Sequence, residues 1–122
     1  MKKELFPVLI DLSEKHVMVL LSQDGDYDEP RLLSLVQRLH ACTGHLSLYA
    51  ASRSASLMKL SEEAGVSLTV KSYKREDLFG ADVVICTLRD PALRGDVFAA
   101  CHTLGIRLCI PGEPARSDFI LP

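Results

Sequence analysis

The chain has 122 residues and a mass of 13.4 kDa, so we expect one domain spanning residues 1–122. Hydrophobic residues make up 48% and charged residues 25%, which excludes a mainly disordered chain. The formal net charge of -2 argues against nucleic-acid binding through bulk positive charge. No apolar run approaches the roughly 20 residues of a membrane-spanning helix, and Pro7 and Asp11 interrupt any signal-peptide core. We therefore expect a cytoplasmic protein that does not bind a membrane.

The cysteines and histidines show no pattern that binds metal. None of the four cysteines forms a Cys-x-x-Cys pair, and no histidine stands at zinc-ligand spacing from them. Each cysteine lies within an apolar segment, where a free cysteine behaves as a small hydrophobic residue. We expect all four to be buried, namely Cys42, Cys86, Cys101 and Cys109.

The first half of the chain alternates between strand and helix patterns. His16 to Leu21 is an apolar run typical of a strand buried on both faces. Asp28-Glu29-Pro30 predicts a helix start, and apolar residues then recur on one helical face up to Cys42. A strand follows at residues 46–50, then a helix over 54–64 capped by Ser54 and ended by Gly65. Residues 66–70 alternate as a third strand.

The second half repeats the pattern. Residues 83–86 predict a fourth strand, and Asp90-Pro91 begins a helix that Gly105 ends. Residues 106–110 predict a fifth strand, and Phe119 to Leu121 is interpreted as a short sixth. This order is typical of an α/β fold, a Rossmann-like, doubly wound and mainly parallel sheet of five or six strands with helices on both faces.

Such a sheet binds ligands beyond the carboxyl ends of its strands, beside the first strand. A glycine-rich turn at that place normally lets the backbone approach a dinucleotide pyrophosphate. In this chain only Gly25 remains of the glycines, and the turn carries four carboxylates: Asp24, Asp26, Asp28 and Glu29. Several negative charges repel a pyrophosphate. The first three of them also have calcium-loop spacing, but Glu29 and Leu35 stand where that loop needs Gly and Glu, so we expect no metal.

Other cofactor contacts are expected after the second strand. That strand lacks the acid that normally binds the adenosine ribose, and Arg53 with a neighbouring serine would suit the 2′-phosphate of NADP. A solvated turn with a helix cap is the alternative interpretation. The candidate cofactor-binding residues are Ser22, Gln23, Gly25, Ser52, Arg53 and Thr87.

Both ends of the chain resemble one family. The segment from Leu5 to Leu12, followed by the strand from Lys15 to Leu20, is similar to the opening of the precorrin-2 dehydrogenase family. Pro114 and the closing segment from Asp118 to Pro122 are similar to the same family after its fifth strand. These proteins are the NAD-binding domains of siroheme synthases, so the resemblance implies a Rossmann domain of tetrapyrrole biosynthesis.

The sequence departs from this family at its functional positions. The family's glycine-rich turn, which leads into an Ala-x-x-Lys helix, is replaced by the longer acidic stretch Ser22 to Pro30. The family's catalytic aspartate aligns with Gly112, so the neighbouring Glu113 is the candidate catalytic residue. The family continues into a dimerisation region and a helical tail, whereas this sequence ends at Pro122. We therefore expect a degenerate and truncated member.

Three functions follow as hypotheses. The first is a Rossmann domain without catalysis, retained as a binding or partner protein near siroheme biosynthesis and without a bound cofactor. The second is an active NAD(P)-dependent precorrin-2 oxidoreductase, with Arg53 at the adenosine and Glu113 or Asp90 near the reacting carbon. The third is a metal or tetrapyrrole carrier. As partners we expect a second copy, paired through the edge near Phe119 to Leu121, or a protein of the tetrapyrrole pathway.

Overall fold

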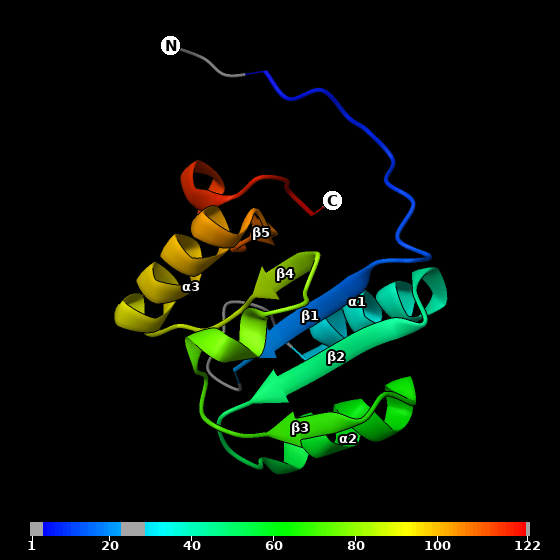
Figure 1. The fold of residues 1–122 in the computed structure, drawn as a ribbon. Coiled ribbons are helices and arrows are strands. Elements are labelled where there is room, and N and C mark those ends of the chain that lie inside the picture. Colours follow the sequence, from blue (N-terminus) through cyan, green and yellow to red (C-terminus); the bar gives the residue numbers. More distant parts are fainter. Residues whose placement is uncertain (1–3, 23–28, 122) are drawn as a thin grey trace.

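A computed structural model describes residues 4–22 and 29–121. Its centre is a five-stranded parallel sheet in the order β3-β2-β1-β4-β5, as Figure 1 shows. The strands are β1 (His16–Leu21), β2 (His45–Ala50), β3 (Leu68–Val70), β4 (Val83–Cys86) and β5 (Arg107–Cys109). The helices are α1 (Glu29–Cys42), α2 (Ala55–Ala64) and α3 (Pro91–Leu104), with short 3-10 helices η1 (Arg75–Leu78) and η2 (Pro114–Arg116). The predicted Rossmann-like fold is confirmed.

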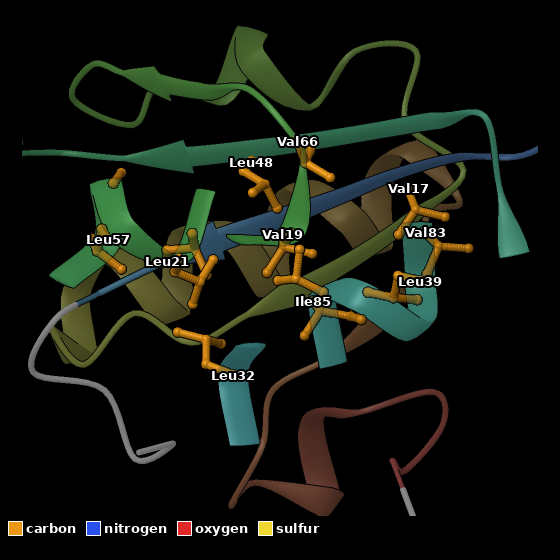
Figure 2. Packing of buried hydrophobic residues seen from close by; sticks show 14 of the residues in the cluster. Val17, Val19, Leu21, Leu32, Leu39, Leu48, Leu57, Val66, Val83 and Ile85 are labelled. Carbon is orange, nitrogen blue, oxygen red and sulfur yellow. The ribbon is translucent and has the colours of Figure 1, made fainter. Parts of the chain in front are cut away.

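The central strand β1 divides its side chains between two hydrophobic clusters. Val17, Val19 and Leu21 face α1 and α2, where they meet Leu48 of β2 and Ile85 of β4 (Figure 2). Successive side chains of a strand point to opposite faces of the sheet, which explains why β1 is apolar along its whole length. The fully buried run therefore marks a strand that is covered by helices on both sides.

The second cluster lies on the α3 face of the sheet. Met18 and Leu20 of β1 pack there with Val84 of β4 and with Val97 and Cys101 of α3. Leu78 of η1 is also fully buried in this cluster. The two clusters together place α1 and α2 on one face and α3 on the other, which is the doubly wound arrangement.

The predicted boundaries of α2 and α3 are confirmed by their caps. The Ser54 side chain accepts a hydrogen bond from the Leu57 amide, and Asp90 accepts from the Ala92 and Leu93 amides. Gly65 and Gly105 end their helices in the left-handed conformation, each with a φ of 71°. Both conformations favour glycine because it has no Cβ.

The expected sixth strand is wrong. Phe119 to Leu121 is irregular, although Phe119 and Leu121 pack against the α1 and α2 cluster. Ser117 and Asp118 cover the outer edge of β5 instead. The Ser117 hydroxyl accepts a hydrogen bond from the Ile110 amide at 2.9 Å, and Asp118 forms hydrogen bonds with the backbone of Leu108. The homodimer expected through this edge stays a prediction, and it would have to displace these bonds.

Burial of the cysteines is confirmed for three of them and wrong for Cys42. Cys86, Cys101 and Cys109 are buried, whereas Cys42 is exposed at the last turn of α1. The buried face of α1 continues instead to Thr43, whose hydroxyl donates to the Lys15 carbonyl at 2.7 Å. Thr43 follows Leu39 by four residues, so it takes the next inward position and leaves Cys42 outside.

Residues 4–11, which we call the N-terminal arm, extend away from the body of the molecule (Figure 1). Every side chain of the arm is exposed, including five large apolar ones. Among the described residues, no helix is both long and apolar enough to cross a membrane.

Candidate functional site

The candidate site lies at the carboxyl ends of β1 and β4, where the order of the strands reverses. From β1 the chain builds outward to β2 and β3, and then returns to the other side of β1 with β4 and β5. In open α/β sheets this reversal opens a crevice for ligands. Ser22, which is partly buried, follows β1 at this edge, and Thr87 follows β4.

Thr87 joins the ends of β4 and β1. Its amide donates to the Leu20 carbonyl at 2.9 Å, and its hydroxyl donates to the same oxygen at 2.8 Å. The side chain is only 4% exposed. Thr87 therefore binds β4 to β1, and its hydroxyl can offer a ligand only its lone pairs.

Ser52 and Arg53 lie beyond β2, directly before α2. Both are exposed, and Arg53 forms no ion pair with any residue in the described part of the chain. The side chain of the next residue, Ser54, already accepts a hydrogen bond as the N-cap of α2. An exposed guanidinium beside a helix N-terminus suits a phosphate, so these residues fit the adenosine side of NADP.

Glu113, the candidate catalytic residue, is held by an ion pair. Arg94 of α3 places its Nη1 atom 3.0 Å from Oε2 of Glu113, and its Nε donates to the Leu88 carbonyl at 2.6 Å. The two side chains are 16% and 29% exposed, and Arg116 approaches the other carboxylate oxygen at 3.8 Å. The carboxylate is thereby fixed against the loops that follow β4 and β5.

Sequence reasoning missed Arg94. The residue lies four positions after the helix cap Asp90, and nothing in its local pattern distinguishes it from a solvated helix charge. Its partner Glu113 is 19 residues away, and the contact exists because α3 packs beside β5. No spacing rule relates two such positions.

Gly112 occupies the position at which the resemblance expects an aspartate. Its φ is 87°, in the left-handed region that side chains with a Cβ disfavour. The turn is closed by the Glu113 amide, which donates to the Ile110 carbonyl at 2.9 Å. This backbone favours glycine and disfavours an aspartate.

Cys86 lies behind these residues at the end of β4. Burial raises the pKa of its thiol to about 11, so it is protonated near neutral pH. A protonated, fully buried thiol is a poor nucleophile and a poor metal ligand. Cys86 is thus a part of the core.

Several predicted residues lie outside the described part of the chain. These are Gln23 and Gly25 of the cofactor turn, together with Asp24, Asp26 and Asp28 of the calcium-like spacing. Within residues 4–22 and 29–121, no three His, Cys, Asp or Glu side chains gather as a metal site would require.

The remaining candidates divide by position. Ser52 and Arg53 extend from β2, while Thr87 and the Arg94–Glu113 pair lie at the ends of β4 and β5. A nucleotide bound in the usual way runs from the first group to the second, across the end of β1. The adenosine end of such a site has suitable side chains. At the reacting end, Glu113 is paired with Arg94, and the other candidate, Asp90, accepts from the amides of the first turn of α3.

Comparison with known proteins gives consistent results. A sequence model of a family described as NAD(P)-binding matches residues 31–122. A siroheme synthase of Psychrobacter sp. (strain PRwf-1) is 26% identical over 117 residues, which is 96% of this chain and 23% of that protein. A siroheme synthase of Pseudomonas putida is 30% identical over 79 residues, or 65% of this chain and 17% of that protein. The chain thus spans less than a quarter of the length of these relatives.

Among solved structures, the fold is similar to that of SirC, a precorrin-2 dehydrogenase. The TM-score is 0.67 at 16% sequence identity, and the match covers 97% of this chain and 54% of that one. The similarity establishes a shared Rossmann-like architecture.

Proposed function

Because the chain belongs to this NAD(P)-binding family, which includes the NAD-binding domains of siroheme synthases, we propose that it is a cytoplasmic Rossmann domain of tetrapyrrole biosynthesis that does not catalyse dehydrogenation. In this proposal the fold is retained for binding a partner protein of the pathway. Neither NAD nor NADP is bound, and no hydride is transferred.

The Arg94–Glu113 ion pair carries this proposal. A general base must be within reach of the proton that it removes and must have free electron pairs directed toward it. Oε2 of Glu113 is engaged by Arg94 at 3.0 Å, and Arg116 lies 3.8 Å from Oε1. A substrate would have to displace Arg94 from Oε2 before that oxygen could accept a proton from it.

Two further features support the loss of catalysis. The backbone at Gly112 disfavours the aspartate that the family places there. The stretch after β1 has the sequence Ser-Gln-Asp-Gly-Asp-Tyr-Asp-Glu, with four acids where a pyrophosphate would need backbone amides and glycines. The two positions lie far apart in the sequence. One disfavours the catalytic aspartate, and the other disfavours binding of the dinucleotide.

The exposed Arg53 favours one alternative, an active NADP-dependent oxidoreductase. In that case Arg53 and Ser52 would hold the 2′-phosphate, and NADP would supply the hydride acceptor. Glu113 would have to exchange its contact with Arg94 for one with the substrate, and Thr87 would keep the ends of β1 and β4 together.

Nucleotide titration separates these possibilities. We would measure thermal unfolding and calorimetric heats with NAD, NADH, NADP and NADPH. A ligand at 100 times its dissociation constant stabilises a protein by about 2.7 kcal/mol, which shifts the Tm of a small domain by several degrees. We expect no shift at millimolar nucleotide, and no oxidation of precorrin-2.

If a nucleotide does raise the Tm, matched variants show whether it binds at the predicted residues. If NADPH does raise the Tm and Arg53→Ala removes the effect, while Arg38→Ala on the outer face of α1 does not, the chain binds the nucleotide and the proposal is wrong on that point. Precorrin-2 oxidation that Glu113→Gln abolishes would show that the chain is the active oxidoreductase.

A further inference from the structure

A cavity of about 430 Å³ lies between α1 and the end of the described chain. Its apolar lining includes Leu35 and Leu39 of α1 and Leu121, and all three belong to the α1 and α2 cluster or pack against it. Ligand pockets typically measure roughly 300–1,000 Å³ and are mainly apolar, with a few polar groups that orient the ligand. This cavity, which we call the α1 cavity, has the size and lining of a small-molecule site.

Ser34 and Arg38 form a polar edge of the α1 cavity. They lie four positions apart on α1, so their side chains are neighbours on the helix surface. Both are exposed, and neither side chain forms an ion pair or a hydrogen bond with the residues that the structure describes. A guanidinium binds a carboxylate through two parallel hydrogen bonds, and a hydroxyl can donate a third. This edge is therefore suited to a carboxylate.

Arg38 supplies the positive charge of this edge. Arg31 also lines the cavity, but it already has an interaction of its own. Arg38 follows Pro30 by eight residues, which is about 12 Å along the helix at ~1.5 Å per residue. This separation exceeds the Debye length of ~8 Å at physiological ionic strength, so exposed charges at the start of α1 are largely screened from Arg38. An anion at Arg38 therefore experiences mainly the charge of this guanidinium.

We propose that the α1 cavity binds a small monocarboxylate with an apolar tail, such as a medium-chain fatty acid. Arg38 and Ser34 donate hydrogen bonds to the carboxylate, and the tail lies over the leucines of the floor. A neutral apolar molecule would leave Arg38 without a partner, and a small inorganic anion would leave the apolar floor in water. Arg38 lies in the second half of α1, whereas the crevice at the ends of β1 and β4 adjoins the start of that helix. The inference is therefore independent of the proposed function.

Calorimetric titration of the full chain with sodium decanoate, below its micelle concentration, measures this binding. We expect one decanoate per chain, and Arg38→Gln should raise the Kd about tenfold because the charged donor is lost. Lys59→Gln removes an exposed cation from α2 and is the matched control, so it should leave the Kd unchanged. A wild-type chain that does not bind decanoate, or an equal Kd in Arg38→Gln, would overturn the proposal.

A second pair of variants tests whether the tail occupies the cavity. Leu121→Ser removes part of the apolar floor and should weaken the binding of both decanoate and 1-decanol. Leu104→Ser removes an exposed leucine of α3 and should change neither. Decanoate binding that Arg38→Gln weakens but Leu121→Ser does not would indicate an ion pair at the surface, and it would contradict binding in the cavity.

Cys42 reports directly on occupation, because it lines the cavity and is the exposed thiol among the four cysteines. Saturating decanoate should slow its modification by iodoacetamide, a neutral reagent, severalfold in the native chain. Acetate has no tail and should give no protection, and decanoate should have no effect on the chain unfolded in urea. Unchanged modification at a decanoate concentration that saturates the calorimetric signal would place the ligand elsewhere and overturn the proposal.

Discussion

Asp118 and Leu108 are joined by two hydrogen bonds. The Asp118 amide donates to the Leu108 carbonyl at 2.7 Å, and the Leu108 amide donates to Oδ2 of Asp118 at 2.9 Å. A residue beyond the sheet thus satisfies both outward-facing backbone groups of Leu108, and the edge of β5 is closed to other strands at this point.

We expect Asp118→Ala to lower the free energy of unfolding by about 1–3 kcal/mol, because it leaves the Leu108 amide without its acceptor. Urea unfolding followed by circular dichroism measures the change. Asp118→Asn keeps a side-chain oxygen at the same place and should lose less. Equal losses in both variants would show that the hydrogen bond is not the source of the stability.

Replacing Gly112 by aspartate should destabilise the protein rather than restore activity. The φ of 87° costs a residue with a Cβ about 1–3 kcal/mol. Gly44 has a negative φ and no atom near its expected Cβ position, so Gly44→Ala is the matched control and should be neutral or slightly stabilising. A Gly112→Asp variant as stable as the wild type would show that the turn does not require glycine.

The thiols should differ sharply in reactivity. Burial raises the pKa of Cys86 to about 11 and that of Cys101 to about 12, and it raises the pKa of Cys109 as well. We expect a thiol-specific reagent at pH 8 to modify one cysteine of the native chain and all four after unfolding. Cys42→Ser should remove the native reaction. Rapid modification of a second thiol would contradict the burial of the other three.

Tyr73 should remain protonated well above pH 10. Burial raises its pKa, and the hydrogen bond to Oδ2 of Asp96, 2.8 Å long, adds to the shift. The folded state therefore retains the proton more tightly than the unfolded state. The stabilisation is present below the unfolded pKa of about 10 and is lost as the pH rises beyond it.

Ultraviolet titration of the phenol measures this pKa in a chain with Tyr27→Phe and Tyr49→Phe. Asp96→Asn should lower the pKa but leave it above 10, because burial remains the larger cause. A phenol that titrates at the ordinary pKa in the parent chain would contradict the packing of Tyr73 against α3.

The strands and helices could be predicted because their signals are local. Ser54 and Asp90 cap the helices that follow them, and the apolar run of β1 shows burial on both faces. The strand predicted for Phe119 to Leu121 was wrong because a short apolar run is equally compatible with a strand and with an irregular segment that covers the core. The hydrogen bonds from the side chains of Ser117 and Asp118 to the backbone at Leu108 and Ile110 favour the irregular segment, and they form only in the folded chain.

The candidate site could be predicted less completely. Thr87 and Glu113 lie at the carboxyl edge of the sheet because both follow strands, and their roles in binding and catalysis stay predictions. The sequence did not indicate that the Thr87 hydroxyl donates to the Leu20 carbonyl, or that Arg94 forms an ion pair with Glu113. Both contacts join residues far apart in the chain, and each changes what the side chain can do.

Because the side chains of β1 are divided between two clusters, the order in which the chain is translated affects its folding. A nascent chain that has emerged as far as β3 contains β1, α1, β2, α2 and β3, whose side chains form much of one cluster. Met18 and Leu20 would be left in water on the opposite face, because their partners in α3 and β5 are not yet made. We therefore expect a stage with a half-covered sheet, in which the growing chain is most exposed to aggregation or chaperone binding until α3 is made.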